Sequence, residues 1–180
     1  MERYRITEGV GIYFVTFTVV EWLPVFISEE PCKIITNSLN FCIQNKELRI
    51  NAYVLMPHHL HAVVFDGGFD SVRLKNTLDD FRKFTGKQLA NHCSNKLPLY
   101  YGEVLEWNAG DDRQRRFWQP TQHPEGIVSD KFWQQKVNYI HWNPVRTGRV
   151  RDPEDWRFSS ASSWASGKND NDVILAGMDW

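Results

Sequence analysis

The sequence has few cysteines, little net charge and no long apolar run, and these shortages exclude several classes of protein. Its three cysteines are an odd number without a CxxC pair, which disfavours a disulfide framework or a cysteine-based zinc cluster. No apolar stretch approaches the roughly 18 residues of a membrane-spanning helix. The N-terminal segment also lacks the small-residue cleavage site of a signal peptide. We therefore expect a cytoplasmic protein with reduced, buried thiols and no membrane partner.

The net charge of -1 argues against a nucleic-acid partner, but the charge is unevenly distributed. From Asp152 onward there are six acidic and two basic residues, so the first 151 residues hold 16 acidic and 19 basic ones. Two basic clusters stand out in this first part: Arg113, Arg115 and Arg116, and then Arg146, Arg149 and Arg151. Each cluster is either a contact surface for nucleic acid or ordinary solvated charge.

The chain is long and apolar enough for one domain with a real core. Its 180 residues are 42% hydrophobic and 14% aromatic, which excludes disorder for the body of the chain. Beyond Asp152 the sequence turns to an Asp-Pro pair, a serine-rich stretch and GKNDND. We therefore predict one domain over residues 1–151 and a partly flexible, loosely held C-terminal extension over residues 152–180.

The hydrophobic pattern predicts alternating strands and helices. It favours strands at 12–20, 49–56, 60–65 and 116–119, and helices at 28–46, 71–93 and 129–142. The last helix begins at Ser129 and should end before Pro144, which lacks an N–H group. Residues 95–112 read as a loop with one short strand at 103–107. This order predicts an α+β fold, a ferredoxin-like antiparallel sheet with helices packed on one face, which by itself fixes no function.

Three of the six histidines fall in the run His58-His59-Leu60-His61. Residues i and i+2 of a strand project to the same face, so His59 and His61 should stand side by side. Two neutral imidazoles can hold a divalent metal ion. The alternative is a pair of hydrogen-bonded histidines in a sheet. We expect His58 to face away from the pair or to sit in the turn.

Tyr139 lies near the end of the third predicted helix, and Asn143 follows four residues later. One helical turn could therefore present both side chains together. A helical tyrosine is more often part of a core or an interface, and Asn143 could simply end the helix before Pro144.

Two separated motifs resemble those of one enzyme family. AYVLMPHHLHAVVF resembles the MPNHxH strand of the single-tyrosine HUH transposases, especially the REP-associated tyrosine transposases. FWQQKVNYIHWNPVRTGRV resembles their catalytic helix and the NPV turn after it, and further blocks match in the same order from about Tyr4 to Trp164. His58 stands where these relatives usually carry Asn.

The resemblance implies roles for particular residues. Tyr139 would be the nucleophile, and His59, His61 and Asn143 would be ligands of Mg²⁺ or Mn²⁺. His123 is a candidate helper, since it lies in a block where relatives often carry histidine. The candidate DNA contacts, chosen by charge, are Lys83, Lys87, Arg115, Arg116, Arg146, Arg149 and Arg151. Phe117, Trp118 and Trp142 could stack on bases or could pack in the core.

The chemistry implied is metal-dependent cleavage and rejoining of single-stranded DNA beside hairpins, such as REP-like or insertion-sequence ends, through a 5′-phosphotyrosine. The covalent bond conserves the phosphodiester energy, so no ATP is needed. The protein would be bacterial and nucleoid-associated when bound to DNA. Whether it is a monomer or a homodimer, and whether the tyrosine helix docks in its own chain or in a partner's, is left open by the sequence.

The sequence leaves three alternative hypotheses. The first is a noncatalytic single-stranded nucleic-acid-binding module of ferredoxin-like fold, but the strands show no RNP-like aromatic pattern. The second is a metallohydrolase that uses metal-bound water, yet no acidic residue lies between Asn51 and Phe65. The third is a domesticated relative that cuts and joins DNA without mobilising itself, which the sequence cannot separate from a mobile-element enzyme.

Overall fold

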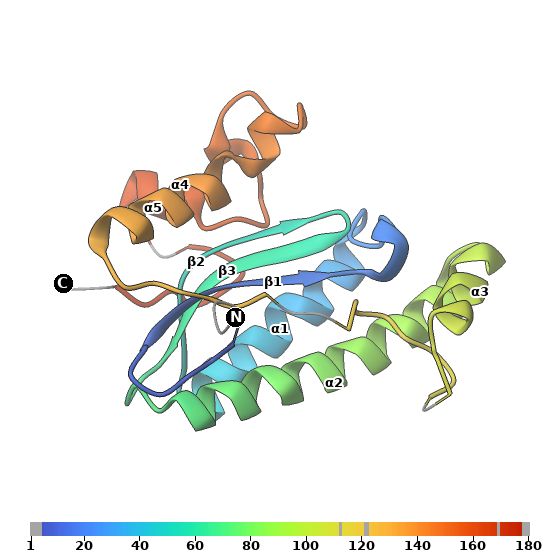
Figure 1. Ribbon diagram of the computed structural model, residues 1–180. Helices are drawn as coiled ribbons and strands as arrows, with labels where there is room; N and C mark the ends of the chain where they lie inside the picture. The colour runs from blue at the N-terminus through green and yellow to red at the C-terminus, as the bar shows by residue number, and fades with distance from the viewer. Residues whose placement is uncertain (1–4, 112, 121–122, 169, 178–180) are drawn as a thin grey trace.

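Four antiparallel strands form one sheet in the order β2-β3-β1-β4 (Figure 1). The computed structural model describes residues 5–111, 113–120, 123–168 and 170–177. The strands are β1 (Ile12–Thr18), β2 (Leu48–Met56), β3 (His59–Asp66) and β4 (Glu125–Gly126). This order, with helices after β1 and β3, is the ferredoxin-like arrangement, so the predicted α+β class is confirmed.

Helices cover both faces of the sheet (Figure 1). The two helices α1 (Glu29–Asn45) and α2 (Ser71–Lys96) pack on one face, in agreement with the predicted ferredoxin-like arrangement. The later helix α4 (Asp130–Arg146) lies over the other face. The remaining helices are short: α3 (Leu99–Trp107), α5 (Ala161–Ser166) and the 3-10 helices η1 (Val20–Trp22) and η2 (Pro153–Asp155).

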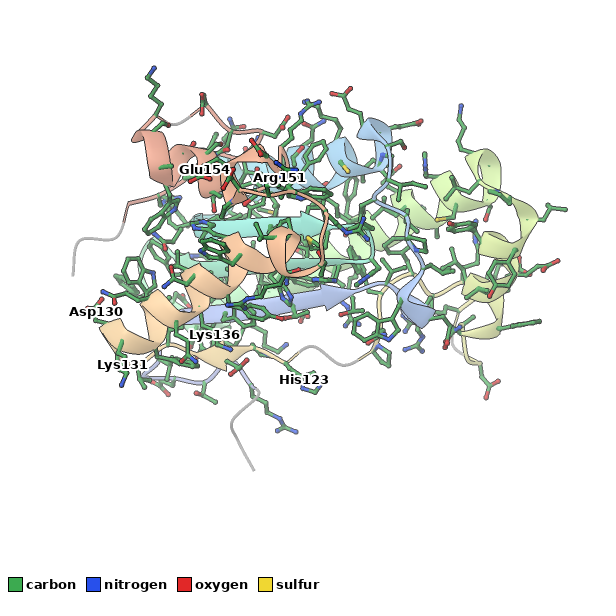
Figure 2. All side chains as sticks on the ribbon, turned by 90° about the horizontal axis from the view of Figure 1, so that it is seen from above. His123, Asp130, Lys131, Lys136, Arg151 and Glu154 are labelled. Carbon is green, nitrogen blue, oxygen red and sulfur yellow. The ribbon has the colours of Figure 1, made fainter. Side chains whose placement is uncertain are left out.

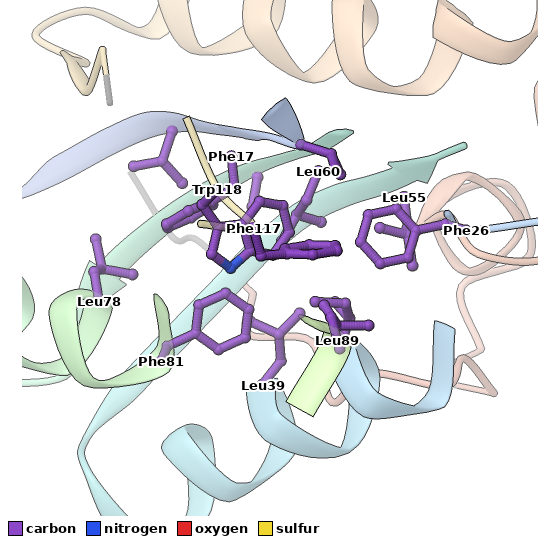
Figure 3. Close-up of a cluster of buried hydrophobic side chains, with 14 of the residues drawn as sticks. Phe17, Phe26, Leu39, Leu55, Leu60, Leu78, Phe81, Leu89, Phe117 and Trp118 are labelled. Atoms are coloured by element: carbon purple, nitrogen blue, oxygen red, sulfur yellow. The ribbon is translucent and has the colours of Figure 1, made fainter. Parts of the chain in front are cut away.

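The two faces of the sheet have separate apolar cores because side chains alternate along each strand. The larger core lies between the sheet and α1 and α2, and Figure 3 shows Phe17, Leu60, Phe81 and Trp118 within it. The smaller core joins Phe14, Val54 and Val63 of the sheet to α4 through apolar side chains of that helix, Val137 and Ile140. The smaller core therefore fixes α4 against the centre of the sheet.

A β-bulge at Asn51 changes which face the residues of β2 occupy. The pairing with β3 shifts between Ile50 and Ala52, so Ile50 enters the larger core and Ala52 the smaller one. The Asn51 side chain is buried, and its Oδ1 accepts a hydrogen bond of 2.8 Å from Nε1 of Trp133 in α4. The bulge thus supplies a polar anchor for α4.

The segment between α2 and α4 differs from the prediction. Residues Leu99–Trp107 are helix α3, where the sequence predicts a loop with a short strand, and Pro98 takes the N-cap position. Its aromatic and apolar residues favour a strand in isolation, but Val104 and Leu105 are buried as neighbours on a helix. The predicted strand at 116–119 makes one isolated bridge, from Trp118 to Val19. Asp112, where the predicted loop ends, lies outside the described residues.

The described part of the C-terminal extension contacts the sheet, and its flexibility stays a prediction. Nε1 of Trp156 donates to the carbonyl of Leu55 (3.0 Å), and the N–H of Ala176 donates to the carbonyl of Ile50 (2.8 Å). Val173 is fully buried. Asn169 and residues 178–180 lie outside the described residues, and the division at 151/152 stays a prediction. Within the described ranges, none of the helices is both long and apolar enough to cross a membrane.

Candidate active site

His59 and His61 lie side by side on the face of β3 that α4 covers. Leu60, between them, enters the larger core on the opposite face, as the strand alternation predicts. The two imidazole centroids are 4.4 Å apart, and both side chains are buried. β1 pairs with β3 here, with Thr16 opposite His61 and Thr18 opposite His59. The central strands of the sheet therefore hold the histidine pair rigidly.

Neighbouring polar groups orient both imidazoles. Nδ1 of His61 lies 2.8 Å from Oγ1 of Thr16, and Nδ1 of His59 lies 2.7 Å from Nδ1 of His58. Nε2 of His59 is buried without a hydrogen-bond partner among the described residues. A buried polar atom without a partner is costly, so this nitrogen is suited to a ligand. His58 sits in the turn, as expected, but it contacts the pair instead of facing away.

The environment keeps the histidines neutral at physiological pH. Burial, together with the smaller effects of the nearby charges of His58 and Arg149, lowers the pKa of His59 to about 4. Burial likewise holds the pKa of His61 well below its ordinary value, with further contributions from His59 and Lys136. Neutral imidazole is the form that binds a metal ion.

Helix α4 brings Tyr139 to this histidine pair within the same chain. Ser129 begins the helix, and its Oγ accepts a hydrogen bond from the N–H of Phe132. The Tyr139 ring lies edge-on to His61, with centroids 5.2 Å apart, and edge-on to Phe14 at 6.0 Å. Its side chain is 39% exposed, so the phenol can be reached from solvent. In this single chain the tyrosine helix therefore lies against the histidine pair.

The helix continues through Pro144 to Arg146, although the sequence predicts an end at Trp142. Asn143 and Pro144 are buried, and this packing offsets the hydrogen bond that the proline cannot donate. The Asn143 carbonyl accepts from the N–H of Thr147 (3.2 Å), which closes the last turn. The extra turn places the Arg146 guanidinium 5.6 Å from the centroid of the Tyr139 ring.

A hydrogen-bonded chain holds α4 and the C-terminal segment on β2. Nε2 of His141 lies 2.8 Å from Oγ of Ser160, and that hydroxyl donates to the carbonyl of Tyr53 and accepts from its N–H. Because His141 lies two residues after Tyr139, these contacts position the helix next to the histidine pair. The sequence alone does not reveal this role, since a contact between residues 53, 141 and 160 leaves no local pattern.

Two histidines and an amide of this region are the candidate ligands for a divalent ion. The two neutral imidazoles, the partnerless Nε2 of His59 and the buried Asn143 one helical turn after Tyr139 are the groups that could serve. Across the described residues, no three His, Cys, Asp or Glu side chains form a group that could hold a metal. Any remaining coordination positions would therefore fall to water or substrate.

The structure separates the other candidate residues into different places. Arg146, Arg149 and Arg151 are exposed at and just after the end of α4. Lys83, Lys87, Arg115 and Arg116 line a cavity on the α2 side of the sheet. His123 is exposed on the segment before β4 (Figure 2).

The expected base-stacking residues are partly wrong. Phe117 and Trp118 are buried in the larger core (Figure 3) and cannot stack on a nucleic-acid base. Trp142 is 46% exposed and stays a candidate. The sequence did not single out Trp22, which is 58% exposed and lies edge-on to His58 with centroids 5.3 Å apart.

Sequence comparison finds similar proteins that carry one name. No protein-family model matches the chain. It is 27% identical over 120 residues to the REP-associated tyrosine transposase of Escherichia coli K12, a match that covers 65% of this chain and 56% of that relative. It is 26% identical over 168 residues to a Haemophilus influenzae protein given the same family name, covering 89% of this chain and 85% of the relative.

A solved structure shares the fold. It is the structure of a REP-associated tyrosine transposase bound to a REP hairpin, with a TM-score of 0.62 and 22% identity over 100% of this chain and 95% of that one. The strand of the histidine pair and the tyrosine helix are the parts of the sequence that resemble this family. In sequence and in fold, this chain is similar to the REP-associated tyrosine transposases.

Proposed function

We propose that the chain is a DNA transposase of the single-tyrosine type, which cuts and rejoins single-stranded DNA beside hairpins through Tyr139. The observation that carries this proposal is the 5.2 Å approach of the Tyr139 ring to the His61 ring. A reachable phenol beside two neutral imidazoles is a suitable arrangement for phosphoryl transfer. The names of the relatives support a DNA-processing activity, and the hairpin bound by the solved relative supports a hairpin substrate.

The proposed metal ligands are His59, His61 and Asn143, with Mg²⁺ or Mn²⁺ as the ion. When bound, the ion would neutralise a non-bridging phosphate oxygen that otherwise repels an attacking anion. The protein contributes the nitrogen lone pairs of its histidines, which would bind the ion. Thr16 can accept the Nδ1 proton of His61 and so leave its Nε2 free, which is how polar neighbours commonly orient histidine ligands.

In the proposed cleavage step, the Tyr139 oxygen forms a bond to phosphorus while the bond from phosphorus to the 3′-oxygen breaks. The phenolic proton leaves to solvent, and the departing 3′-oxygen takes up a proton to become a 3′-OH. The product is a 5′-phosphotyrosine. Because the phosphodiester energy is kept in this bond, a 3′-OH from another strand can reverse the step and join to the held 5′ end.

The arrangement of the helices and histidines disfavours two alternative hypotheses, the noncatalytic binding module and the metallohydrolase. A noncatalytic module of this fold would bind nucleic acid on an open sheet face, but α1 and α2 cover one face and α4 covers the other. A hydrolase that uses metal-bound water usually needs a carboxylate base beside the histidines, and the described residues hold no group of three His, Cys, Asp or Glu that could form such a site.

The test is covalent capture of DNA by Tyr139. A single-stranded DNA with a hairpin, labelled at its 3′ end, is incubated with the protein and Mn²⁺ and run on a denaturing gel. Wild type should give a labelled protein adduct, because the 5′-phosphate stays on the enzyme. The same DNA labelled at its 5′ end should instead release a short fragment ending in a 3′-OH.

Matched variants decide which residues act. Tyr139→Phe removes one hydroxyl and should give no adduct, whereas Tyr100→Phe, on exposed α3, should behave as wild type. His59→Ala with His61→Ala should abolish metal-dependent cleavage while the chain stays folded. An adduct from Tyr139→Phe equal to that of wild type would assign the attack to another residue. Cleavage without any adduct would point to a water nucleophile and exclude the tyrosine mechanism.

A further inference from the structure

Three aromatic rings contact one another where α4 meets β1 and β3. The Phe14 ring stacks on His61, with centroids 5.2 Å apart and an interplanar angle of 26°. The same ring meets Tyr139 edge-on at 6.0 Å, and Tyr139 meets His61 edge-on at 5.2 Å. Because each ring contacts the other two, the position of Phe14 affects the gap between the proposed nucleophile and the proposed metal ligand.

Lys136 lies three residues before Tyr139 and packs on the same Phe14 ring. Its ammonium group is 4.2 Å from the centroid of Phe14 and 5.1 Å from that of Phe132. Residues three apart on a helix are neighbours on its surface, so Lys136 and Tyr139 project from the same side of α4. Figure 2 shows Lys136 on the side of the helix that faces β1. Phe14 therefore contacts two side chains of α4 as well as His61 of β3.

Glu125 of β4 fixes the ammonium group of Lys136. Its Oε1 accepts a hydrogen bond of 2.7 Å from Nζ of Lys136, and the side chains of Lys136 and Glu125 are 16% and 27% exposed. β4 pairs with β1 so that Glu125 lies opposite Phe14, which places the carboxylate next to the ring. A largely buried charge without a partner is costly, so this pairing confines Lys136 to its place on Phe14.

A second polar contact holds α4 at the opposite edge of the sheet. Nε1 of Trp133 donates to Oδ1 of Asn51 in β2 at 2.8 Å, whereas the ion pair of Lys136 reaches β4. β2 and β4 are the two outer strands of the sheet. Contacts at both edges resist rotation of the helix about its axis. Such a rotation would change the distance between the Tyr139 and His61 rings.

We propose that Lys136, with Glu125 as its counter-ion, is a positioning residue that holds the Tyr139 oxygen in line for attack on the phosphate. This inference rests on the proposed function and adds to it a residue that acts through Phe14 and the helix. Phosphoryl transfer needs the attacking oxygen close to phosphorus and aligned with the leaving oxygen. A misplacement of about 1 Å can cost about 100-fold in rate, so a small shift of α4 should be measurable.

The first test separates rate from binding. Adduct formation is followed in a single turnover with Mn²⁺ and saturating hairpin DNA labelled at its 3′ end. Lys136→Met keeps the alkyl chain but removes the charge, and it should slow adduct formation about 10- to 100-fold while DNA affinity in EDTA changes little. Lys136→Arg keeps a cation within reach of Glu125 and should restore most of the rate. The matched control is Lys131→Met, at an exposed lysine in the first turn of α4, which should react as wild type.

The ion pair itself is tested by a double-mutant cycle. Glu125→Gln leaves an amide oxygen that can still accept a hydrogen bond, so its effect on the rate should be smaller than that of Lys136→Met. Because the two side chains act as a unit, the double variant should react no more slowly than Lys136→Met alone. A double variant whose loss equals the product of the two single losses would overturn the role of the pair.

The second test observes Tyr139 without DNA. NMR spectra of protein with ¹³C-labelled tyrosine report the ring currents of neighbouring aromatic groups, and Tyr139→Phe assigns the Tyr139 signal. In Lys136→Met this signal should move toward that of a tyrosine without ring contacts. The signals of Tyr13 and Tyr53, which are buried in the larger core, should stay in place and show that the chain is folded. Lys136→Arg should keep the Tyr139 signal close to its wild-type position.

Each outcome bears on the proposal. A wild-type rate for Lys136→Met, or an equal loss in the Lys131→Met control, would overturn it. An unchanged Tyr139 signal in Lys136→Met would also overturn it, because the lysine would then act other than by placing the ring. If wild type forms no adduct, the proposed function fails, and the Tyr139 signal still decides whether Lys136 places the phenol.

Discussion

Nδ1 of His58 and Nδ1 of His59 lie 2.7 Å apart, so the two rings share one proton in a hydrogen bond. If His59 donates, its Nε2 keeps a lone pair, and this is the buried nitrogen without a partner among the described residues. If His59 accepts, its Nε2 carries a buried hydrogen with nowhere to donate it, which is costly. The arrangement therefore favours the tautomer of His59 that can bind a metal ion.

We predict that His58 strengthens metal binding through this contact. His58→Ala removes the acceptor and should weaken Mn²⁺ binding about 10- to 100-fold, the usual effect of losing a group that orients a histidine ligand. His58→Asn restores an oxygen acceptor and should recover most of the affinity. Calorimetric titration with Mn²⁺ measures both, with Lys131→Gln as the control at an exposed residue. Equal affinities for wild type and His58→Ala would remove this role.

Trp22 should stack on a base of the single-stranded flank. Glu21 and Trp22 both have positive φ angles, 50° and 55°, a strained conformation for residues with side chains. The strain holds an exposed indole beside His58, at the edge of the histidine pair. Trp22→Ala should cost about 1–3 kcal/mol of binding free energy for single-stranded DNA.

A matched comparison separates base stacking by Trp22 from nonspecific apolar contact with DNA. Trp107 is 79% exposed on α3, so Trp107→Ala removes a similar apolar surface far along the chain from His58. Trp22→Phe keeps an aromatic face and should retain most of the affinity. If Trp22→Ala and Trp107→Ala bind single-stranded DNA as tightly as wild type, the indole has no part in recognition.

The histidine pair could be predicted because it depends on local geometry alone. The two-residue period of a strand put His59 and His61 on one face, and the apolar runs of β1, β2 and β3 placed that strand in the sheet. The contact of Tyr139 with His61 needed the family resemblance as well, since no local pattern says where a helix docks. Thr16 was missed for the same reason, because strand register determines its position opposite His61.

The misplaced elements depend on long-range packing. A proline ends most helices. Here Asn143 and Pro144 are buried, and α4 continues one turn beyond its predicted end. Residues beyond Asp152 are polar and rich in turns, yet the bulge at Asn51 offers them partners: Nδ2 of Asn51 donates to the carbonyl of Ala176 at 3.2 Å. Propensity describes the isolated segment, whereas these contacts exist only in the folded chain.

Asp66 should make the free energy of unfolding depend on pH in the acidic range. The guanidinium of Arg73 donates to both of its oxygens (2.7 and 2.6 Å) and lowers the pKa of Asp66 against the raising effect of burial; the N–H groups of Asp70 and Gly68 lower it further. As pH falls, the Asp66 carboxylate is therefore protonated in the unfolded chain, near pH about 3.9, before it is protonated in the folded chain. The stabilisation is therefore complete above pH 5 and is lost as pH falls through the native pKa.

Urea unfolding of Asp66→Asn and wild type checks this. At pH 7 the variant should lose about 1–2 kcal/mol of unfolding free energy, a modest value because Arg73 is half exposed. At pH 3 the difference should shrink. Asp155→Asn, at an exposed aspartate, should match wild type throughout. A difference of the same size at both pH values would mean that the charge of Asp66 contributes nothing.

Arg146 should assist the chemistry of Tyr139. Its guanidinium lies 5.6 Å from the centre of the phenol ring, in the turn that α4 gains beyond Pro144. A fixed positive charge there favours the negative charge that develops on the phenol and phosphate oxygens during transfer. Arg146→Gln should slow adduct formation by about 100-fold, the scale seen when one group stabilising such charge is removed, and Arg146→Lys should restore part of the rate.

A control variant and saturating substrate separate an effect on the rate of adduct formation from an effect on DNA binding. Arg151→Gln removes the same charge at an exposed position after α4 and should leave the single-turnover rate of adduct formation near that of wild type. If Arg146 merely attracts DNA, saturating substrate should restore the rate of Arg146→Gln, whereas loss of charge stabilisation persists at saturation. Recovery of the wild-type rate at saturation would therefore assign Arg146 to binding and leave the phenol without this cationic partner in the reaction.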